Sequence, residues 1–199
     1  MHNQQLKEIE GNLQEAINLI GDAAGAKPLG FRAPAFSIPR NRLEIYDLLS
    51  KYFEYDSSYI LLESDCANKN FFDSTPFNLK NISEFPIIPK TYFNKINIKS
   101  GGTFFRLFSS KIISSVMKKN AALGFTPLIY LHPYDYLYDL EFKVEYKNFL
   151  GAGLIDGTKR YLRQSQWLQL NNKSTLNKLI KLSEEFDHIG PMKLALKNA

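Results

Sequence analysis

Three side chains able to do chemistry follow short apolar stretches of the sequence. His132 comes directly after the apolar run 127–131, and an imidazole, which titrates near neutral pH, suits general acid or base catalysis. Arg32 lies in an otherwise apolar stretch, where a half-buried guanidinium requires an anionic partner, and Asp56 could supply that charge. If these stretches are parallel strands, the chemistry belongs at their C-terminal ends, where all three residues lie.

Each of the three also has a structural interpretation, which the sequence leaves open. His132 could cap a strand and hydrogen-bond a loop, and Arg32 and Asp56 could form a structural salt bridge, which is the commoner role of such pairs. The other two histidines, His2 and His188, are expected to be structural or surface residues. Because three histidines so far apart show no metal-ligand spacing, the residues themselves predict no metal site.

Composition and charge narrow the classes of partner and location. The formal charge is +5, from 25 basic and 20 acidic residues, but no basic run is dense enough for nucleic acid, so we expect no such partner. The single cysteine, Cys66, excludes an internal disulfide. No apolar stretch approaches the roughly 20 residues of a membrane span. Residues 1–7 lack the apolar region of a signal peptide, so we predict a cytoplasmic protein.

Apolar periodicity predicts helices that alternate with strands. The predicted helices are 3–24, 41–53, 110–121 and 175–186, and the predicted strands lie within 29–39, 55–59, 84–89 and 127–131. Residues 62–83 predict a long polar loop, and residues 103–108 fit either a strand or the start of a helix. The last helix is expected to have Ser174 as N-cap and to bury Leu176, Leu179, Ile180 and Phe186. This order favours an α/β fold with a largely parallel sheet in a single domain, 1–199.

Five segments, in order, resemble motifs of the polysaccharide deacetylases, in their bacterial surface-glycan branch. Residues 31–37 (Phe-Arg-Ala-Pro-Ala-Phe-Ser) resemble the Arg-x-x-Pro-type motif, and residues 55–58 (Tyr-Asp-Ser-Ser) resemble the next motif. Residues 84–86 and 101–107 resemble later strands of that branch. Residues 131–135 (Leu-His-Pro-Tyr-Asp) resemble the Leu-His motif, although this branch more often has Glu at the last position.

The resemblance, which covers residues 5–190, implies a distorted (β/α) barrel that hydrolyses N-acetyl groups of a glycan. In that family a divalent metal, zinc, binds the attacking water, the Leu-His histidine protonates the leaving amine, and the arginine orients the catalytic base. Carried over, His132 is the general acid and Arg32 is the orienting arginine. Asp56 would help to shape the site by pairing with an arginine.

The sequence departs from the family at the metal site. An Asp-Asp motif supplies the base and one metal ligand in the family, and a His-x-x-x-His motif supplies two more, but neither motif occurs in these 199 residues. We therefore expect an incomplete barrel, truncated at the N-terminus and lacking its first strand or strands, and we expect no metal or other cofactor in this chain by itself.

Two functions from different classes remain open. The first is a metal-dependent deacetylase of a surface glycan, inactive or incomplete as this chain alone, whose missing segment a partner chain could supply. The second is a non-catalytic glycan-binding or partner-completing module of the same fold. Whether this chain is itself an enzyme is not decided by its sequence.

Overall fold

The chain divides into two compact units in the computed structural model. Unit 1 comprises Met1–Thr91, Asn120–Pro127 and Ile189–Ala199, and unit 2 comprises Tyr92–Lys119 and Leu128–His188. The structure describes residues 1, 3–62, 77–79, 82–93, 95–137, 141, 143–188 and 190–196. His2, Cys66 and most of the predicted loop 62–83 lie outside the described residues.

A four-stranded sheet with the order β1-β2-β4-β3 organises unit 1. β1 (Gly30–Phe31), β2 (Tyr55–Asp56) and β4 (Ile82–Glu84) are parallel, and β3 (Phe77–Leu79) is antiparallel to β4. The register pairs Phe31 with Asp56, and Asp56 with Glu84. Because parallel strands end at the same edge of a sheet, the segments that follow β1, β2 and β4 emerge together.

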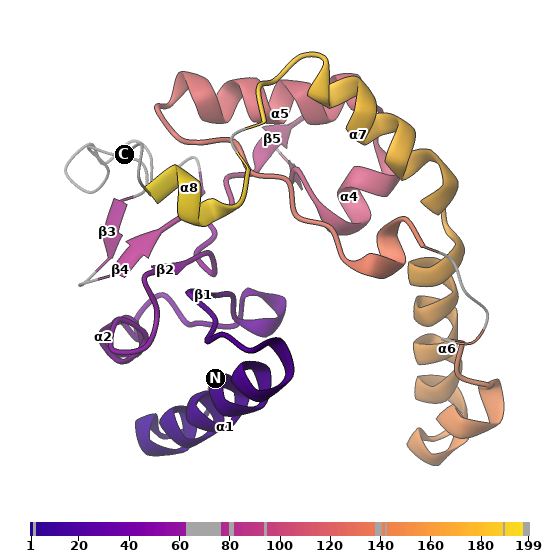
Figure 1. The fold of residues 1–199 in the computed structure, drawn as a ribbon. Helices are drawn as coiled ribbons and strands as arrows, with labels where there is room; N and C mark the ends of the chain where they lie inside the picture. The colour runs from indigo at the N-terminus through magenta and orange to yellow at the C-terminus, as the bar shows by residue number, and fades with distance from the viewer. Residues whose placement is uncertain are drawn as a thin grey trace. The chain divides into compact units, whose positions relative to one another are not determined.

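Two helices build the core of unit 1 with this sheet. α1 (Leu6–Ala24) confirms the predicted helix 3–24, and α2 (Glu44–Leu49) lies within the predicted helix 41–53. Figure 1 shows the ribbons of α1, α2 and the strands of this sheet. The buried residues of α1, spaced three or four apart, share one core with residues of α2 and β4. They are Ile9, Leu13 and Ile17, which share that core with Ile45, Leu49 and Ile82. The described part of unit 1 also includes α8 (Met192–Leu196).

Unit 2 is mainly helical. Its helices are α4 (Gly102–Leu107), α5 (Ser110–Ala122) up to Lys119, α6 (Leu154–Gln169) and α7 (Thr175–Ser183). Shorter 3-10 helices are η3 (Pro133–Asp135), η5 (Tyr146–Ala152) and η6 (Asn172–Ser174). Strand β6 (Ile96–Ile98) and the last residue of β5 (Lys90–Tyr92) belong to this unit, and the two strands form a two-stranded sheet. The buried core residues are Ile98, Phe105, Ile113, Val116, Met117 and Leu182.

The predicted strand 127–131 is absent from the structure. Tyr130 makes only an isolated parallel bridge with Gly101, and residues 128–131 are half-buried rather than buried. Pro127 and Pro133 bracket the run, and a proline has no N–H to donate to a ladder of sheet hydrogen bonds. Residues 103–108, for which the sequence left two possibilities, are helical up to Leu107.

The predicted core face of the last helix is wrong in part. Leu176 and Ile180 are 55% and 53% exposed, whereas Leu182 is buried. Ser174 does not cap α7 with its side chain; its hydroxyl donates instead to the Asn171 carbonyl oxygen at 2.9 Å. α7 therefore carries more apolar residues than the core of unit 2 buries.

Nothing in the described helices combines the length and the apolar composition needed to cross a membrane. The (β/α) barrel implied by the resemblance stays a prediction.

Candidate functional site

Arg32 ties together the segments that follow three strands of unit 1. Its Nε donates to the Ser57 carbonyl oxygen at 3.0 Å, and its Nη2 donates to the Ser57 hydroxyl oxygen at 2.8 Å. That hydroxyl in turn donates to the carbonyl oxygen of Phe85, just after β4, at 2.7 Å. The half-buried guanidinium therefore fixes the residue next to Asp56.

Ser58 connects the same segments to the Asp56 carboxylate. Its hydroxyl accepts a hydrogen bond from the Ala33 backbone N–H at 2.7 Å and donates to Asp56 Oδ1 at 2.8 Å. The Ser58 backbone N–H donates to Asp56 Oδ2 at 2.9 Å. These contacts bring the predicted Arg32 and Asp56 segments into one polar cluster.

A second carboxyl group, Glu84, lies beside Asp56 in the parallel register. Both side chains are fully buried, and a hydrogen bond joins them. Burial raises the pKa of Glu84 well above its usual range, and the charge of Asp56 raises it further. Burial also raises the pKa of Asp56, although its hydrogen bonds oppose that shift. Two buried carboxyls in contact cannot both ionise cheaply, so the pair favours holding one proton, and the larger rise in pKa is that of Glu84.

The backbone after Arg32 is strained. Ala35 and Phe36 have φ angles of 52° and 54°, a left-handed conformation that costs non-glycine residues on the order of 1–3 kcal/mol each. The Arg32 guanidinium lies over the Phe36 ring, 5.9 Å from its centroid. Strain of this kind persists only where surrounding contacts hold it, and it is commonest at functional sites.

His132, the third predicted site residue, lies in unit 2. Its side chain is exposed, and its ring stacks on Tyr134 with centroids 4.8 Å apart and an interplanar angle of 13°. Its backbone N–H donates to Asp135 Oδ2 at 2.8 Å, which closes the η3 turn. The turn thus holds the backbone of His132 while the imidazole meets solvent.

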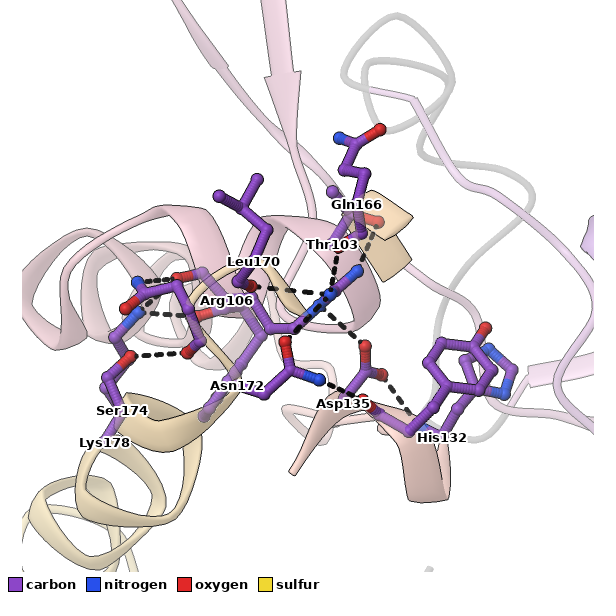
Figure 2. A network of polar contacts seen from close by, with 12 residues as sticks. Thr103, Arg106, His132, Asp135, Gln166, Leu170, Asn172, Ser174 and Lys178 are labelled. Carbon is purple, nitrogen blue, oxygen red and sulfur yellow. Dashed lines mark hydrogen bonds and ion pairs between the residues drawn. The ribbon is translucent and has the colours of Figure 1, made fainter. Parts of the chain in front are cut away.

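Asp135 binds a buried arginine with its other oxygen. Arg106 Nε lies 2.9 Å from Asp135 Oδ1, and the side chains are 2% and 0% exposed (Figure 2). Arg106 Nη1 also donates to the Gln166 carbonyl oxygen at 2.9 Å, near the end of α6. A guanidinium stabilises the last carbonyls of a helix, which carry the negative end of its dipole. Arg106 therefore joins the His132 turn to α6.

Polar side chains from the segment between α6 and α7 complete this network. Asn172 Nδ2 donates to the carbonyl oxygen of Tyr134, and Asn172 Oδ1 lies 3.4 Å from Arg106 Nη1. Lys178 Nζ donates to the carbonyl oxygens of Phe105 and Arg106 at 3.1 and 2.5 Å. Figure 2 shows Arg106 at the centre, with Asp135 between it and His132.

A cavity of about 730 Å³ opens beside the His132 turn, within unit 2. Pro133 and Tyr134 line it on one side, with Leu137 just after η3. Phe149 of η5 and Leu168 of α6 continue the apolar wall. Ligand sites in proteins are typically concavities of roughly this size, mainly apolar with a few polar groups.

The structure thus brings together Arg32 and Asp56 in unit 1, and it places His132 in unit 2. Sequence reasoning missed three charged partners: Glu84, Arg106 and Asp135. A signal for them existed, because each is a charged residue in or beside an apolar segment. Which charge pairs with which depends on tertiary contacts that no local pattern shows.

The described residues do not fit the zinc site that the resemblance implies. No group of three or more His, Cys, Asp or Glu residues lies close enough to hold a metal ion in the part of the chain that the structure describes. A catalytic zinc requires three protein ligands, and the Asp56–Glu84 pair offers two carboxyls that bind each other.

One family model matches the chain. It is described as a domain of unknown function, DUF3473, and it matches residues 57–189, more than half of the chain. The match includes Ser57, Glu84, Arg106 and the His132 turn, whereas Arg32 and Asp56 precede it. No curated protein and no solved structure matches the chain.

Proposed function

The chain belongs to the DUF3473 family, and we propose that it serves in the removal of N-acetyl groups from a surface glycan. That family is associated with polysaccharide deacetylase-like proteins. The proposal extends this association to a reaction, the hydrolysis of a sugar acetamide to acetate and a free amine.

The observation that carries the proposal is the contact of Arg32 with Ser57. The segments 31–37 and 55–58 resemble consecutive deacetylase motifs, and Arg32 meets Ser57 although the two residues are 25 positions apart in the sequence. The two hydrogen bonds of 3.0 and 2.8 Å fix Arg32 against the residue that follows Asp56. An arginine held in this way can orient a neighbouring carboxylate, because its planar fork has few alternative positions.

His132 is the residue that we assign to proton transfer. When water replaces the amine on the acetyl carbon, the C–N bond breaks and the nitrogen must gain a proton. An exposed imidazole can supply that proton, and the stacking on Tyr134 restricts its orientation. Asp135 holds the backbone of His132, and Arg106 neutralises the Asp135 charge. Asp135 and Arg106 are therefore positioning residues.

Divalent-metal chemistry belongs to the reaction that the resemblance implies, but the described residues do not group three ligands for it. We therefore derive no step through a metal. The contribution assigned to this chain is the orienting guanidinium of Arg32 and the proton of His132.

The test is acetate release from a hexasaccharide of N-acetylglucosamine, with Zn²⁺ supplied. We expect acetate release once the missing metal-site segment is supplied, and His132→Ala should then lose about 10²–10⁴-fold of the rate, the usual contribution of a general acid. His188→Ala is the matched control, because His188 is also an exposed histidine of unit 2 and contacts none of the site residues in the described hydrogen bonds. Equal rates in both variants would remove His132 from the mechanism.

A non-catalytic glycan-binding module is the second candidate. Two observations favour it: the described residues bring no three potential metal ligands together, and aromatic rings line the cavity beside His132. Calorimetry with the same hexasaccharide separates the candidates. Binding without acetate release would support the module, and acetate release would support the deacetylase.

A further inference from the structure

A groove of about 220 Å³ lies between α5 and the end of α7, within unit 2. Residues of α5 that share one helix face line one side of it: Ser110, Lys111, Ser114 and Lys118. Residues at the C-terminal end of α7 and just beyond it line the other side: Lys181, Leu182 and Glu185. Leu182 is buried in the same core as Ile113 of α5, so the packing of unit 2 holds the two sides in place.

The charge of this groove is mainly positive. Three lysines line it, and Glu185 is the one acidic residue among the described residues of the lining. The Glu185 carboxylate pairs with Lys118 and accepts a hydrogen bond from the Ser114 hydroxyl. These contacts lower the pKa of Glu185, so it is ionised at neutral pH and neutralises Lys118. The groove therefore keeps the positive charges of Lys111 and Lys181, for which the described residues provide no carboxylate partner.

The size and the chemistry of the groove favour a compact anion. Its volume is below the roughly 300–1,000 Å³ of typical small-molecule sites, so it fits a phosphate group better than an oligosaccharide. A lysine ammonium is a compact point charge that suits phosphate, whereas a carboxylate is best matched by the planar fork of arginine. The described residues of the lining include no arginine. Ser110, which is half-buried, adds a hydroxyl that can donate to a phosphate oxygen.

We infer that the groove between α5 and α7 binds a phosphate group, held by the ammonium groups of Lys111 and Lys181. The shared chemistry is a tetrahedral anion with a charge of about −1.5 to −2 at pH 7, from inorganic phosphate or from a phosphate ester of a sugar. None of the described residues of the groove belongs to the Arg32 cluster or to the His132 turn, so the inference does not depend on the proposed function.

Nuclear magnetic resonance titration of the isotope-labelled whole chain with inorganic phosphate locates the site. We expect saturable shifts of the backbone amide signals of residues 110–118 and 181–185, and no such shifts with potassium chloride at the same ionic strength. N-Acetylglucosamine 1-phosphate distinguishes the two sources of the phosphate. Binding more than about threefold tighter than that of inorganic phosphate identifies a sugar ester, and equal or weaker binding identifies the free ion.

Substitutions in the groove should change the affinity for inorganic phosphate in opposite directions. Lys111→Gln and Lys181→Gln should each weaken binding on the order of tenfold, because each removes a charge that faces the anion. Glu185→Gln should strengthen binding by about threefold or more, because it removes the opposing charge and releases Lys118. Calorimetric titration measures these affinities, and circular dichroism checks that each variant keeps its helices.

Two matched controls change the net charge of the chain by the same amounts outside the groove. Lys159→Gln removes a lysine of α6 that pairs with Asp156, and Glu184→Gln removes the exposed carboxylate next to Glu185. Each control should change the affinity by less than about twofold.

Three results would overturn the inference. The first is the absence of saturable shifts in residues 110–118 and 181–185 of the wild-type protein. The second is a folded double variant, Lys111→Gln with Lys181→Gln, that binds phosphate as tightly as the wild type. The third is an effect of the control variants as large as that of the groove variants, which would show that binding follows the net charge of the chain.

Discussion

At the scale of single residues, the candidate site depends on charges that the fold has buried and paired. Arg106 and Asp135 are almost inaccessible to solvent and bind each other directly. A buried ion pair is weak evidence for stability as such, but removal of one partner leaves an uncompensated charge in the interior. The same Asp135 carboxylate accepts a hydrogen bond from the His132 backbone N–H, so the loss of Asp135 would also release the backbone of His132.

Asp135→Ala is expected to lower the free energy of unfolding by about 3–5 kcal/mol, because it strands the Arg106 guanidinium. Urea denaturation followed by circular dichroism measures this change. The matched control is Asp156→Asn, which disrupts an exposed contact of 3.7 Å with Lys159 and should cost less than about 0.5 kcal/mol. Similar costs for the two variants would contradict the assignment of Arg106 and Asp135 as a buried unit.

The Asp56–Glu84 pair predicts a pH dependence of stability. Both folded-state pKa values are raised, so the folded chain binds protons more tightly than the unfolded chain. The stability that this proton confers is fully present below the ordinary glutamate pKa of 4.5 and is lost as the pH rises through the higher folded-state pKa of Glu84. The free energy of unfolding should therefore fall with rising pH in that window, by up to about 1.4 kcal/mol per pH unit.

Glu84→Gln provides the control for this pH effect. The amide keeps a neutral hydrogen-bond donor toward Asp56 but cannot titrate, so its stability profile should be flatter than that of the wild type above pH 4.5. Urea unfolding at a series of pH values measures both profiles. Parallel profiles would show that Glu84 is not the residue that holds the shared proton.

At the scale of elements, the position of Arg32 depends on how closely β1 approaches β2. A Cβ atom added to Gly30 would lie 2.0 Å from the Tyr55 ring, which is far inside any real contact distance. Glycine is needed there for the close approach of β1 to the Tyr55 side chain, rather than for an unusual backbone angle. The contacts of Arg32 with Ser57, directly beyond this pair, depend on that spacing.

Gly30→Ala is therefore expected to destabilise the protein by about 1–3 kcal/mol through overpacking. Gly11→Ala is the matched control, because Gly11 lies within α1 with no atom within 4 Å of the added Cβ, and alanine there should stabilise the helix by about 0.5–1 kcal/mol. Thermal unfolding measures both changes. Opposite changes in stability for the two variants would support the described packing, and a Gly30→Ala variant with unchanged stability would contradict it.

At the scale of the whole molecule, local patterns were enough to predict most helices. The helices predicted at 3–24 and 110–121 are α1 and α5, and the buried residues of α1 recur at helical spacing. The prediction of a strand at 127–131 was wrong because apolar content alone does not show whether a neighbouring strand is present. The prediction that Leu176 and Ile180 are buried was wrong because a helical pattern does not show how far the core extends.

The candidate site could be predicted only in part for a related reason. Arg32, Asp56 and His132 stood out as polar residues beside apolar runs, but Arg32 binds Ser57, 25 positions away, and the Asp135 that holds His132 binds the distant Arg106. The carbonyl oxygen of Gln166 that Arg106 binds is 60 residues away along the chain. Ser57 lies in the segment 55–58 that resembles a deacetylase motif, but only the folded chain shows that it joins Arg32 to Phe85.

The most direct test of the central claim compares the hydrolysis of an N-acetylated hexasaccharide with that of 4-nitrophenyl acetate, in the presence of Zn²⁺. The amine must be protonated as it leaves, whereas 4-nitrophenolate leaves readily without a proton. His132→Ala is therefore predicted to lose about 10²–10⁴-fold on the acetamide and less than about tenfold on the ester. An equal loss on both substrates would contradict the assignment of His132 as the acid, and no hydrolysis of the acetamide by the wild-type protein, once the missing metal-site segment is supplied, would contradict the proposed function itself.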